Sequence, residues 1–172
     1  MKANDMVYPE KHGNMIREVT QNDLNGCLEV IRAGFQTVAD EFGLTRENCP
    51  TNGAFMPMER LRSDFDKGNC MLAVFDGGMP IAFMQLAKSN YDTVLLEKLA
   101  VLPQYRHRGY GKSLLDFAKA RSAQLGAKRI SISVIEENFR LKQWYEANGF
   151  TQTEVKTYPH LPFTVGYMEF LL

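Results

Sequence analysis

Eight consecutive residues, RHRGYGKS at positions 106–113, combine the residue types that bind phosphate. Gly109 and Gly111 lack side chains, so an anion can come close to the backbone N–H groups there. Four basic side chains accompany them, and no acidic residue occurs between Pro103 and Leu115. A helix that begins at these glycines would direct unpaired N–H groups and the positive end of its dipole toward the same anion. The stretch therefore predicts a phosphate site.

Three phosphate-binding patterns compete for this stretch. A Walker loop, G-x-x-x-x-G-K-[ST], would end in the GKS of this chain, but Arg106 stands at its first glycine position. A dinucleotide fingerprint, G-x-G-x-x-G, would begin at Gly109 and Gly111, but Leu114 stands where the third glycine belongs. The remaining pattern is R-x-x-G-x-G between a strand and a helix, and its alternative is a plain glycine turn with solvated cations.

The hydrophobic pattern predicts the elements that must hold this loop in place. Alternation and short apolar runs predict strands at 15–20, 70–76, 80–88, 92–102, 127–135, 151–156 and 164–172. Apolar residues at helical spacing predict helices at 21–35, 58–68, 111–126 and 138–150, and 36–57 is predicted to be a short helix and a long loop. GGM at 77–79 predicts a hairpin between two of these strands, and an antiparallel meander followed by β-α-β crossovers gives an α/β (α+β type) fold. We expect a mixed, mostly antiparallel central sheet of about six to seven strands with helices on both faces.

The composition indicates one globular domain and narrows the choice of partners. The 172 residues include 20 basic and 20 acidic side chains, and a formal net charge of zero argues against nucleic acid or a membrane surface as partner. Three widely spaced cysteines without a C-x-x-C pair predict reduced thiols, a cytoplasmic location and no metal. Residues 1–14 lack the apolar core of a signal peptide, and we expect them to be a flexible extension before a single domain at 15–172.

A second motif lies at 138–150, NFRLKQWYEANGF, where an Asn is followed by an aromatic-Tyr pair and then by Gly-Phe. The first motif is LEKLAVLPQYRHRGYGKSLLDFA at 96–118. With both motifs in this order, the chain resembles the GNAT superfamily of acyl-CoA N-acyltransferases over about 15–172. The resemblance implies a GNAT-like fold and acetyl-CoA as co-substrate, with the N–H groups of the loop holding the pyrophosphate of coenzyme A.

The resemblance also implies how the rest of the co-substrate is held. Residues Leu99–Val101 are expected to splay away from the neighbouring strand, so that their backbone pairs with the pantetheine arm and an N–H polarises the thioester carbonyl. Asn138, at a helix start, is expected to cap that helix and to contact the same arm. The full set of expected contacts is Leu99, Ala100, Val101, Arg106, His107, Arg108, Gly109, Tyr110, Gly111, Lys112 and Asn138.

Two residues are candidates for acid–base chemistry. The resemblance places Tyr145 beside the sulfur of coenzyme A, where a phenol can protonate or hydrogen-bond the departing thiolate. Glu97 is the candidate base, because a carboxylate in the same strand could take a proton from an attacking ammonium through a water. Alternation along the strand predicts that Glu97, Leu99 and Val101 share one face. The alternatives are a core role for Tyr145, and an ion pair or the opposite face for Glu97.

The acceptor site is expected at two regions, 35–57 and 156–164. The first carries three acids that could attract a cationic amine: Asp40, Glu41 and Glu47. The second carries an aromatic patch with a histidine that is a candidate contact or base: Tyr158, His160 and Phe163. We expect acetyl transfer to a primary amine, on a small molecule rather than a protein. A non-catalytic acyl-CoA-binding or sensor module is the alternative function. Edge strands at the C-terminus could also pair two subunits into a homodimer.

Overall fold

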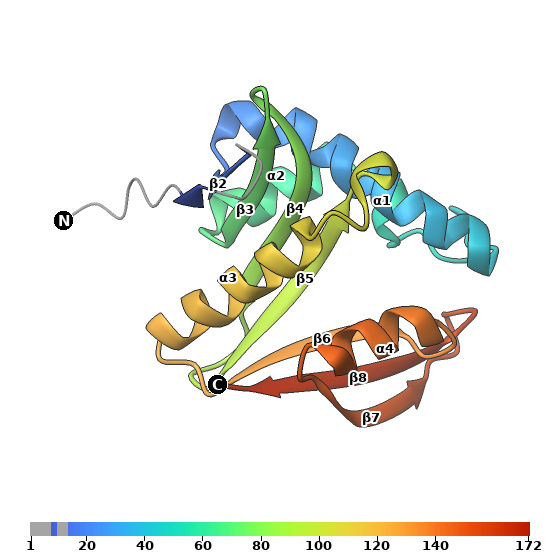
Figure 1. The fold of residues 1–172 in the computed structure, drawn as a ribbon. Helices are drawn as coiled ribbons and strands as arrows, with labels where there is room; N and C mark the ends of the chain where they lie inside the picture. Colours follow the sequence, from blue (N-terminus) through green and yellow to red (C-terminus); the bar gives the residue numbers. More distant parts are fainter. Residues whose placement is uncertain (1–7, 10–13) are drawn as a thin grey trace.

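The chain folds around one mixed sheet, and the computed structural model describes residues 8–9 and 14–172. The strands lie in the order β1-β2-β3-β4-β5-β6-β8-β7, and of the described pairs only β5 and β6 run parallel (Figure 1). Their bounds are β1 (Tyr8–Pro9), β2 (Met15–Glu18), β3 (Cys70–Asp76), β4 (Met79–Lys88), β5 (Thr93–Val101), β6 (Arg129–Ile135), β7 (Thr151–Thr157) and β8 (Thr164–Leu171). The predicted mostly antiparallel sheet is confirmed, and the two-residue β1 adds to the seven predicted strands.

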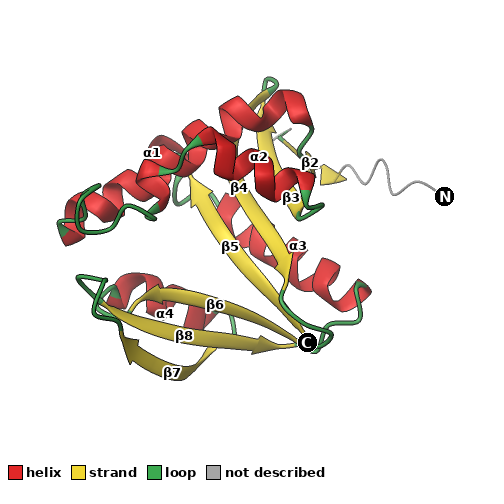
Figure 2. Cartoon of the chain, turned by 180° about the vertical axis from the view of Figure 1, so that it is seen from behind, coloured by secondary structure: helices red, strands yellow, loops and turns green. Residues whose placement is uncertain are grey.

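Helices cover both faces of the sheet, as the sequence predicts. Their bounds are α1 (Leu24–Phe42), α2 (Met58–Asp66), α3 (Tyr110–Gln124) and α4 (Phe139–Ala147), with 3-10 turns at Gln21–Asp23, Gly53–Phe55 and Pro103–Tyr105. Figures 1 and 2 show α1 and α2 on one face and α3 and α4 on the other, and each pair packs on the sheet through its own apolar core. In the described part of the chain, no helix is both long and apolar enough to cross a bilayer.

Helix α1 is longer than the sequence predicts. The expected break after residue 35 is wrong, because the helix continues to Phe42 and ends at Gly43, which adopts φ 62°. Within this helix, Gly34 is buried against β5. A side-chain carbon added there would lie 2.9 Å from the Ala100 Cβ, so the glycine lets α1 approach the strand closely.

Two other expectations concern the hairpin and the N-terminus. Gly77 and Gly78 both take positive φ and connect β3 to β4 in the predicted hairpin.

Most of the expected flexible extension at 1–14 lies outside the described residues. Within it, β1 pairs with β2, and Asn14 is buried and donates its Nδ2 to Tyr110 Oη at 2.5 Å.

Candidate active site

Strands β5 and β6 diverge immediately after they pair, and this divides the sheet into a β1–β5 arm and a β6–β8–β7 arm. Their parallel ladder has three pairs and ends where Leu95 lies opposite Ser131. Beyond this point β5 stays paired with β4 up to Val101, while β6 continues along β8 (Figure 1). On the edge toward β6, the backbone of 96–101 has no described strand partner. The predicted splay at Leu99–Val101 is confirmed, and it leaves backbone groups with which an extended ligand could pair.

A β-bulge in β5 changes the direction of the side chains that follow it. Between Glu97 and Ala100, two residues of β5 lie opposite one residue of β4, and Lys98 takes a positive φ of 56°. Glu97 therefore lies on the face covered by α2, whereas Leu99 and Val101 pack against the core beneath α3 and α4. The prediction that the three side chains share one face is wrong, because alternation fails at the bulge and no glycine marks its position.

The loop after β5 leads into a helix N-terminus with open N–H groups. Gly109 caps α3 with φ 91°, and the first backbone bond of the helix runs from Ser113 N to Gly109 O at 2.9 Å. No described protein group accepts a hydrogen bond from the N–H groups of 107–112. A side-chain carbon added at Gly109 would meet no atom within 4 Å. Open N–H groups facing open space are what a phosphate site at a helix N-terminus requires.

Two of the predicted phosphate contacts have their side chains engaged elsewhere. The Arg106 guanidinium donates to Gly34 O at 3.0 Å and to Thr37 Oγ1 at 2.9 Å, so it fastens the loop to α1. The Tyr110 ring is buried beneath α3, where its hydroxyl accepts the hydrogen bond from Asn14. The Arg106 side chain therefore holds the loop against α1, and its positive charge stays in the loop because both acceptors are neutral.

Three other loop side chains remain exposed around the open N–H groups. His107 adopts φ 62°, and the Arg108 guanidinium carbon lies 5.3 Å from the centroid of the Tyr105 ring. Lys112 Nζ lies 2.6 Å from a carboxylate oxygen of Asp116. An exposed ion pair of this kind contributes only about 0.3–0.5 kcal/mol, so Lys112 can exchange Asp116 for a bound anion.

Helix α4 brings the second motif against the first. A side-chain carbon added at Gly111 would lie 3.6 Å from Val101 and 3.7 Å from the Trp144 indole, so the indole packs on the start of α3. Asn138 Oδ1 accepts from Leu141 N at 3.1 Å, and the predicted N-cap is confirmed. The two motifs, which are separate in sequence, therefore form one surface.

Tyr145 is buried in α4 and is only 6% exposed. The rings of Trp144 and Phe150 contact it edge-on, with centroids at 4.9 and 5.3 Å. Its hydroxyl makes no hydrogen bond to a described residue. Burial raises the pKa of the phenol above its ordinary value, because a phenolate would lose its hydration there. Tyr145 therefore keeps its proton at neutral pH and has a hydrogen bond to donate.

Glu97 lies in a polar cluster between the sheet and α2. Its Oε2 accepts from Gln85 Nε2 at 2.9 Å and from Lys98 Nζ at 3.2 Å. The ion pair that the sequence left as an alternative is thus present. The Glu97 side chain is still 40% exposed, so water can reach the carboxylate. Sequence reasoning missed the cluster because its members come from α2, β4 and β5, and no spacing links them.

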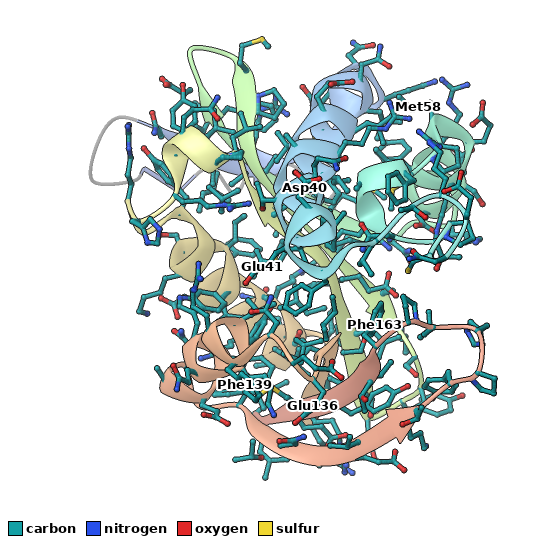
Figure 3. All side chains as sticks on the ribbon, turned by 90° about the vertical axis from the view of Figure 1, so that its right-hand side faces the viewer. Asp40, Glu41, Met58, Glu136, Phe139 and Phe163 are labelled. Carbon is teal, nitrogen blue, oxygen red and sulfur yellow. The ribbon has the colours of Figure 1, made fainter. Side chains whose placement is uncertain are left out.

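The two regions predicted to shape the acceptor site pack against each other. They share a small core of Ala39, Leu44, Cys49 and Ala54, and we call this core and the side chains around it the bridging cluster. The surrounding side chains come from both arms: Phe35, Phe42, Phe55, Ile135, Leu161 and Phe163. Figure 3 shows Asp40 and Glu41 at the end of α1, and Glu136 and Phe163 on the opposite arm. The arms are therefore joined by the short ladder at one end of β6 and by the bridging cluster at the other.

The aromatic patch of the β7–β8 loop includes a residue that the sequence did not single out. The rings of Tyr158 and His160 lie 5.7 Å apart, and the Tyr158 hydroxyl is 2.7 Å from that of Tyr167. This hydrogen bond, together with partial burial, raises the pKa of Tyr167 to about 12. Regular alternation along β8 places Tyr167 on the face opposite α4, but nothing in the sequence indicates its hydroxyl partner. Among the described residues, no group of three His, Cys, Asp or Glu side chains is arranged to hold a metal ion.

Solved structures share this architecture. The ribosomal-protein-S18-alanine N-acetyltransferase from Escherichia coli has a TM-score of 0.73 and 16% identity, covering 92% of this chain and 93% of that one. The PaiA N-acetyltransferase from Thermoplasma acidophilum, solved with coenzyme A, has a TM-score of 0.70 and 21% identity, covering 92% and 99%. Both are N-acetyltransferases, and at these identities the likeness shows a shared fold.

The sequence comparisons give the family. A model of the acetyltransferase (GNAT) family matches residues 39–150, and this chain belongs to that family. An amino-acid acetyltransferase of Azotobacter vinelandii is 26% identical over 144 residues, which are 84% of this chain. The chain spans 29% of the length of that relative.

Proposed function

We propose that the chain is an N-acetyltransferase that moves an acetyl group from acetyl-CoA to a primary amine. The observation that carries this proposal is the open N-terminus of α3 beside the unpaired edge of β5. Helix α4 packs on the same place and carries a buried tyrosine whose hydroxyl has no described partner. The coenzyme A in the Thermoplasma acidophilum relative supports the choice of donor.

The residues present fit coenzyme A. The N–H groups of 107–112 would hold its pyrophosphate, with Arg108 and Lys112 adding positive charge. The free edge of β5 at Leu99–Val101 would pair with the pantetheine amides as an added strand does. Asn138, whose Oδ1 is used by the helix cap, has its amide Nδ2 left for the same arm.

The chemistry requires a neutral amine, a polarised carbonyl and a protonated leaving group. The amine nitrogen bonds to the thioester carbon, the C–S bond breaks, and the products are an amide and the thiol of coenzyme A. A backbone N–H of the β5 edge polarises the carbonyl oxygen, and Glu97 takes the proton of the amine through a water. Tyr145 donates its hydrogen bond to the sulfur as negative charge develops there. Tyr145 gives its proton to the departing sulfur and regains one from solvent, because burial disfavours a lasting phenolate, while Glu97 releases the amine proton to solvent.

The acceptor is proposed to be a small amine with an apolar body. The aromatic side chains of the bridging cluster provide apolar surface, and Asp40 and Glu41 at the end of α1 provide negative charge for an ammonium group. A broad set of amines tests this proposal: coenzyme A thiol release from acetyl-CoA is measured for each acceptor, and calorimetry measures acetyl-CoA binding. Binding without thiol release by any acceptor would favour the non-catalytic acyl-CoA sensor instead.

A fluorescence measurement tests the location of the donor. Trp144 is the single tryptophan of the chain and its indole packs beside Gly111. Saturating coenzyme A is expected to change its emission, because phosphate and its water would arrive next to the ring. The midpoint of this change should equal the Kd from calorimetry. Heat of binding without any change in emission would place the phosphates away from the start of α3.

A glutamine at position 97 tests the proposed base. Glu97→Gln is expected to lower kcat/KM for the amine by about 100-fold or more at pH 7, since general base catalysis contributes about 100- to 10,000-fold. The loss should shrink as the pH approaches the pKa of the amine, because more of the amine is then already neutral. The pH dependence of kcat/KM for both proteins measures this effect. An equal loss at every pH would indicate a packing defect.

A further inference from the structure

Gln85 in β4 is a polar residue that packing alone does not explain. Its side chain is fully buried. Its Nε2 donates to Glu97 Oε2 at 2.9 Å and lies 3.5 Å from Asp64 Oδ2. Ionised carboxylates only accept hydrogen bonds, so these two neighbours fix which end of the amide carries the nitrogen. The Gln85 Oε1 atom is then buried without a described donor, at a cost of about 1–3 kcal/mol. A leucine or methionine would fill the same space without this cost.

Lys98, at the bulge of β5, is held in an unusual conformation beside the same two acids. A positive φ in a residue other than glycine costs about 1 kcal/mol or more, and such strain tends to occur at functional sites. The bulge turns Lys98 to the face of Glu97, where its side chain is only 8% exposed. Its Nζ lies 2.9 Å from Asp64 Oδ2 and 3.2 Å from Glu97 Oε2.

Two carboxylates therefore compete for one buried ammonium group. Asp64 is the nearer and the more buried, with 15% of its side chain exposed against 40% for Glu97. Burial opposes ionisation of Asp64, but the hydrogen bond and the charge of Lys98 outweigh it and lower the pKa of Asp64. Lys67, directly after α2, has its Nζ 3.8 Å from Asp64 Oδ1 and is mostly exposed. Asp64 thus balances most of the Lys98 charge, and less of that charge acts on Glu97.

From this geometry we infer that Asp64, Gln85 and Lys98 are positioning residues for Glu97. Gln85 and Lys98 hold Oε2 by two hydrogen bonds, so the other carboxylate oxygen is kept in one orientation toward the exposed side. Asp64 limits how strongly Lys98 neutralises Glu97. The inference rests on the proposed role of Glu97 as base. It adds that this role depends on the Gln85 amide and the Asp64–Lys98 ion pair on the same face of the sheet.

Opposite effects of two substitutions test the inference. The pH profile of kcat/KM for the amine should rise on its acidic limb as Glu97 loses its proton. In Asp64→Asn, Lys98 pairs with Glu97 alone, so this limb should move to a pH lower by about 0.5–1 unit, and the plateau value of kcat/KM should fall. In Lys98→Met, Glu97 loses its cation, so the limb should move up by a similar amount. Gln85→Leu should move the limb up, with a lower kcat and an unchanged KM for acetyl-CoA. Carbon-13 NMR titration of the Glu97 carboxyl should show the same three directions without any substrate.

Asp66→Asn is the matched control, because Asp66 is exposed on the same helix, α2. It should leave both the pH profile and the carboxyl titration unchanged. Circular dichroism checks that each variant folds. If Lys98→Met does not fold, the downward shift in Asp64→Asn and the upward shift in Gln85→Leu decide the question.

The outcomes separate the inference from the function on which it rests. No thiol release by the wild-type protein with any amine would overturn the N-acetyltransferase proposal, while the NMR titration would still report on the network. An acidic limb that persists in Glu97→Gln would overturn the base role. A limb that depends on Glu97 but does not shift, or shifts the same way, in Asp64→Asn and Lys98→Met would overturn the positioning network.

Discussion

Coenzyme A binding is expected to weaken by at least about 100-fold when Gly109 is replaced by valine. Gly109 adopts φ 91°, where a side chain strains the backbone by about 1–2 kcal/mol. The space in front of it is open, so the isopropyl group fits there and covers the N–H groups at the start of α3. Loss of two hydrogen bonds to a charged phosphate, at about 1.5 kcal/mol each, accounts for about 100-fold in Kd. Isothermal titration calorimetry measures the effect.

Gly126→Val controls for the backbone strain. Gly126 follows the other end of α3, adopts φ 76° and likewise has no atom within 4 Å of an added side-chain carbon. Both variants should lose similar stability in thermal unfolding, but only Gly109→Val should lose affinity. Equal loss of affinity in both would trace the effect to instability. Normal affinity in Gly109→Val would move the phosphate site away from this helix.

Replacing Tyr145 with phenylalanine is expected to lower kcat by about 100-fold, the scale of catalysis by one positioned proton donor. The Kd for acetyl-CoA should change by less than about twofold, because the substitution removes one hydroxyl among the many protein groups proposed to contact acetyl-CoA. The hydroxyl has no described hydrogen-bond partner, so the midpoint of thermal unfolding should stay the same. Single-turnover kinetics separates the chemical step from product release. An unchanged rate of that step would end the proposed role.

The pH dependence of the wild-type enzyme gives an independent check on Tyr145. Burial raises the pKa of this phenol, so the folded protein keeps its proton at a pH where an unfolded tyrosine, with a pKa of about 10, begins to lose its own. Tyr145 should then contribute no descending limb to kcat below about pH 10. Above that pH the unfolded state binds fewer protons than the folded state, so stability should fall. A descending limb near neutral pH that disappears in Tyr145→Phe would contradict the buried neutral phenol.

Local patterns predicted most of the fold, and the failures occur where a distant contact decides the structure. The positions of the seven predicted strands, the Gly77-Gly78 turn and the Asn138 cap depend on neighbours in sequence, and all three are confirmed. The helix that was expected to end at residue 35 continues to Phe42, and its close approach to the sheet at Gly34 depends on Ala100 of β5. The bulge at Lys98 is another case, because a lysine at positive φ has no local signature.

The candidate site shows the same division. The backbone of the glycine loop and the position of Tyr145 follow from motif spacing, since each lies at the start of a helix or within it. The partners of the Arg106 guanidinium, Gly34 and Thr37, are about seventy positions away in sequence, so its role in fastening the loop was not predictable. Gln85 was overlooked because one polar residue in an apolar strand gives no sign of its neighbours on other elements.

The two attachments between the arms separate two kinds of evolutionary change. Three ladder pairs and the bridging cluster set the opening between β5 and β6, and the cluster includes Leu161 and Phe163 of the β7–β8 loop. The proposed coenzyme A site, at 107–112, shares no residue with that loop. Larger or smaller residues at 161 and 163 would therefore change the width of the opening that an acceptor enters. The affinity for coenzyme A should stay the same. Related chains can therefore evolve different amine specificities through substitutions in the β7–β8 loop, while their acetyl-CoA site stays unchanged.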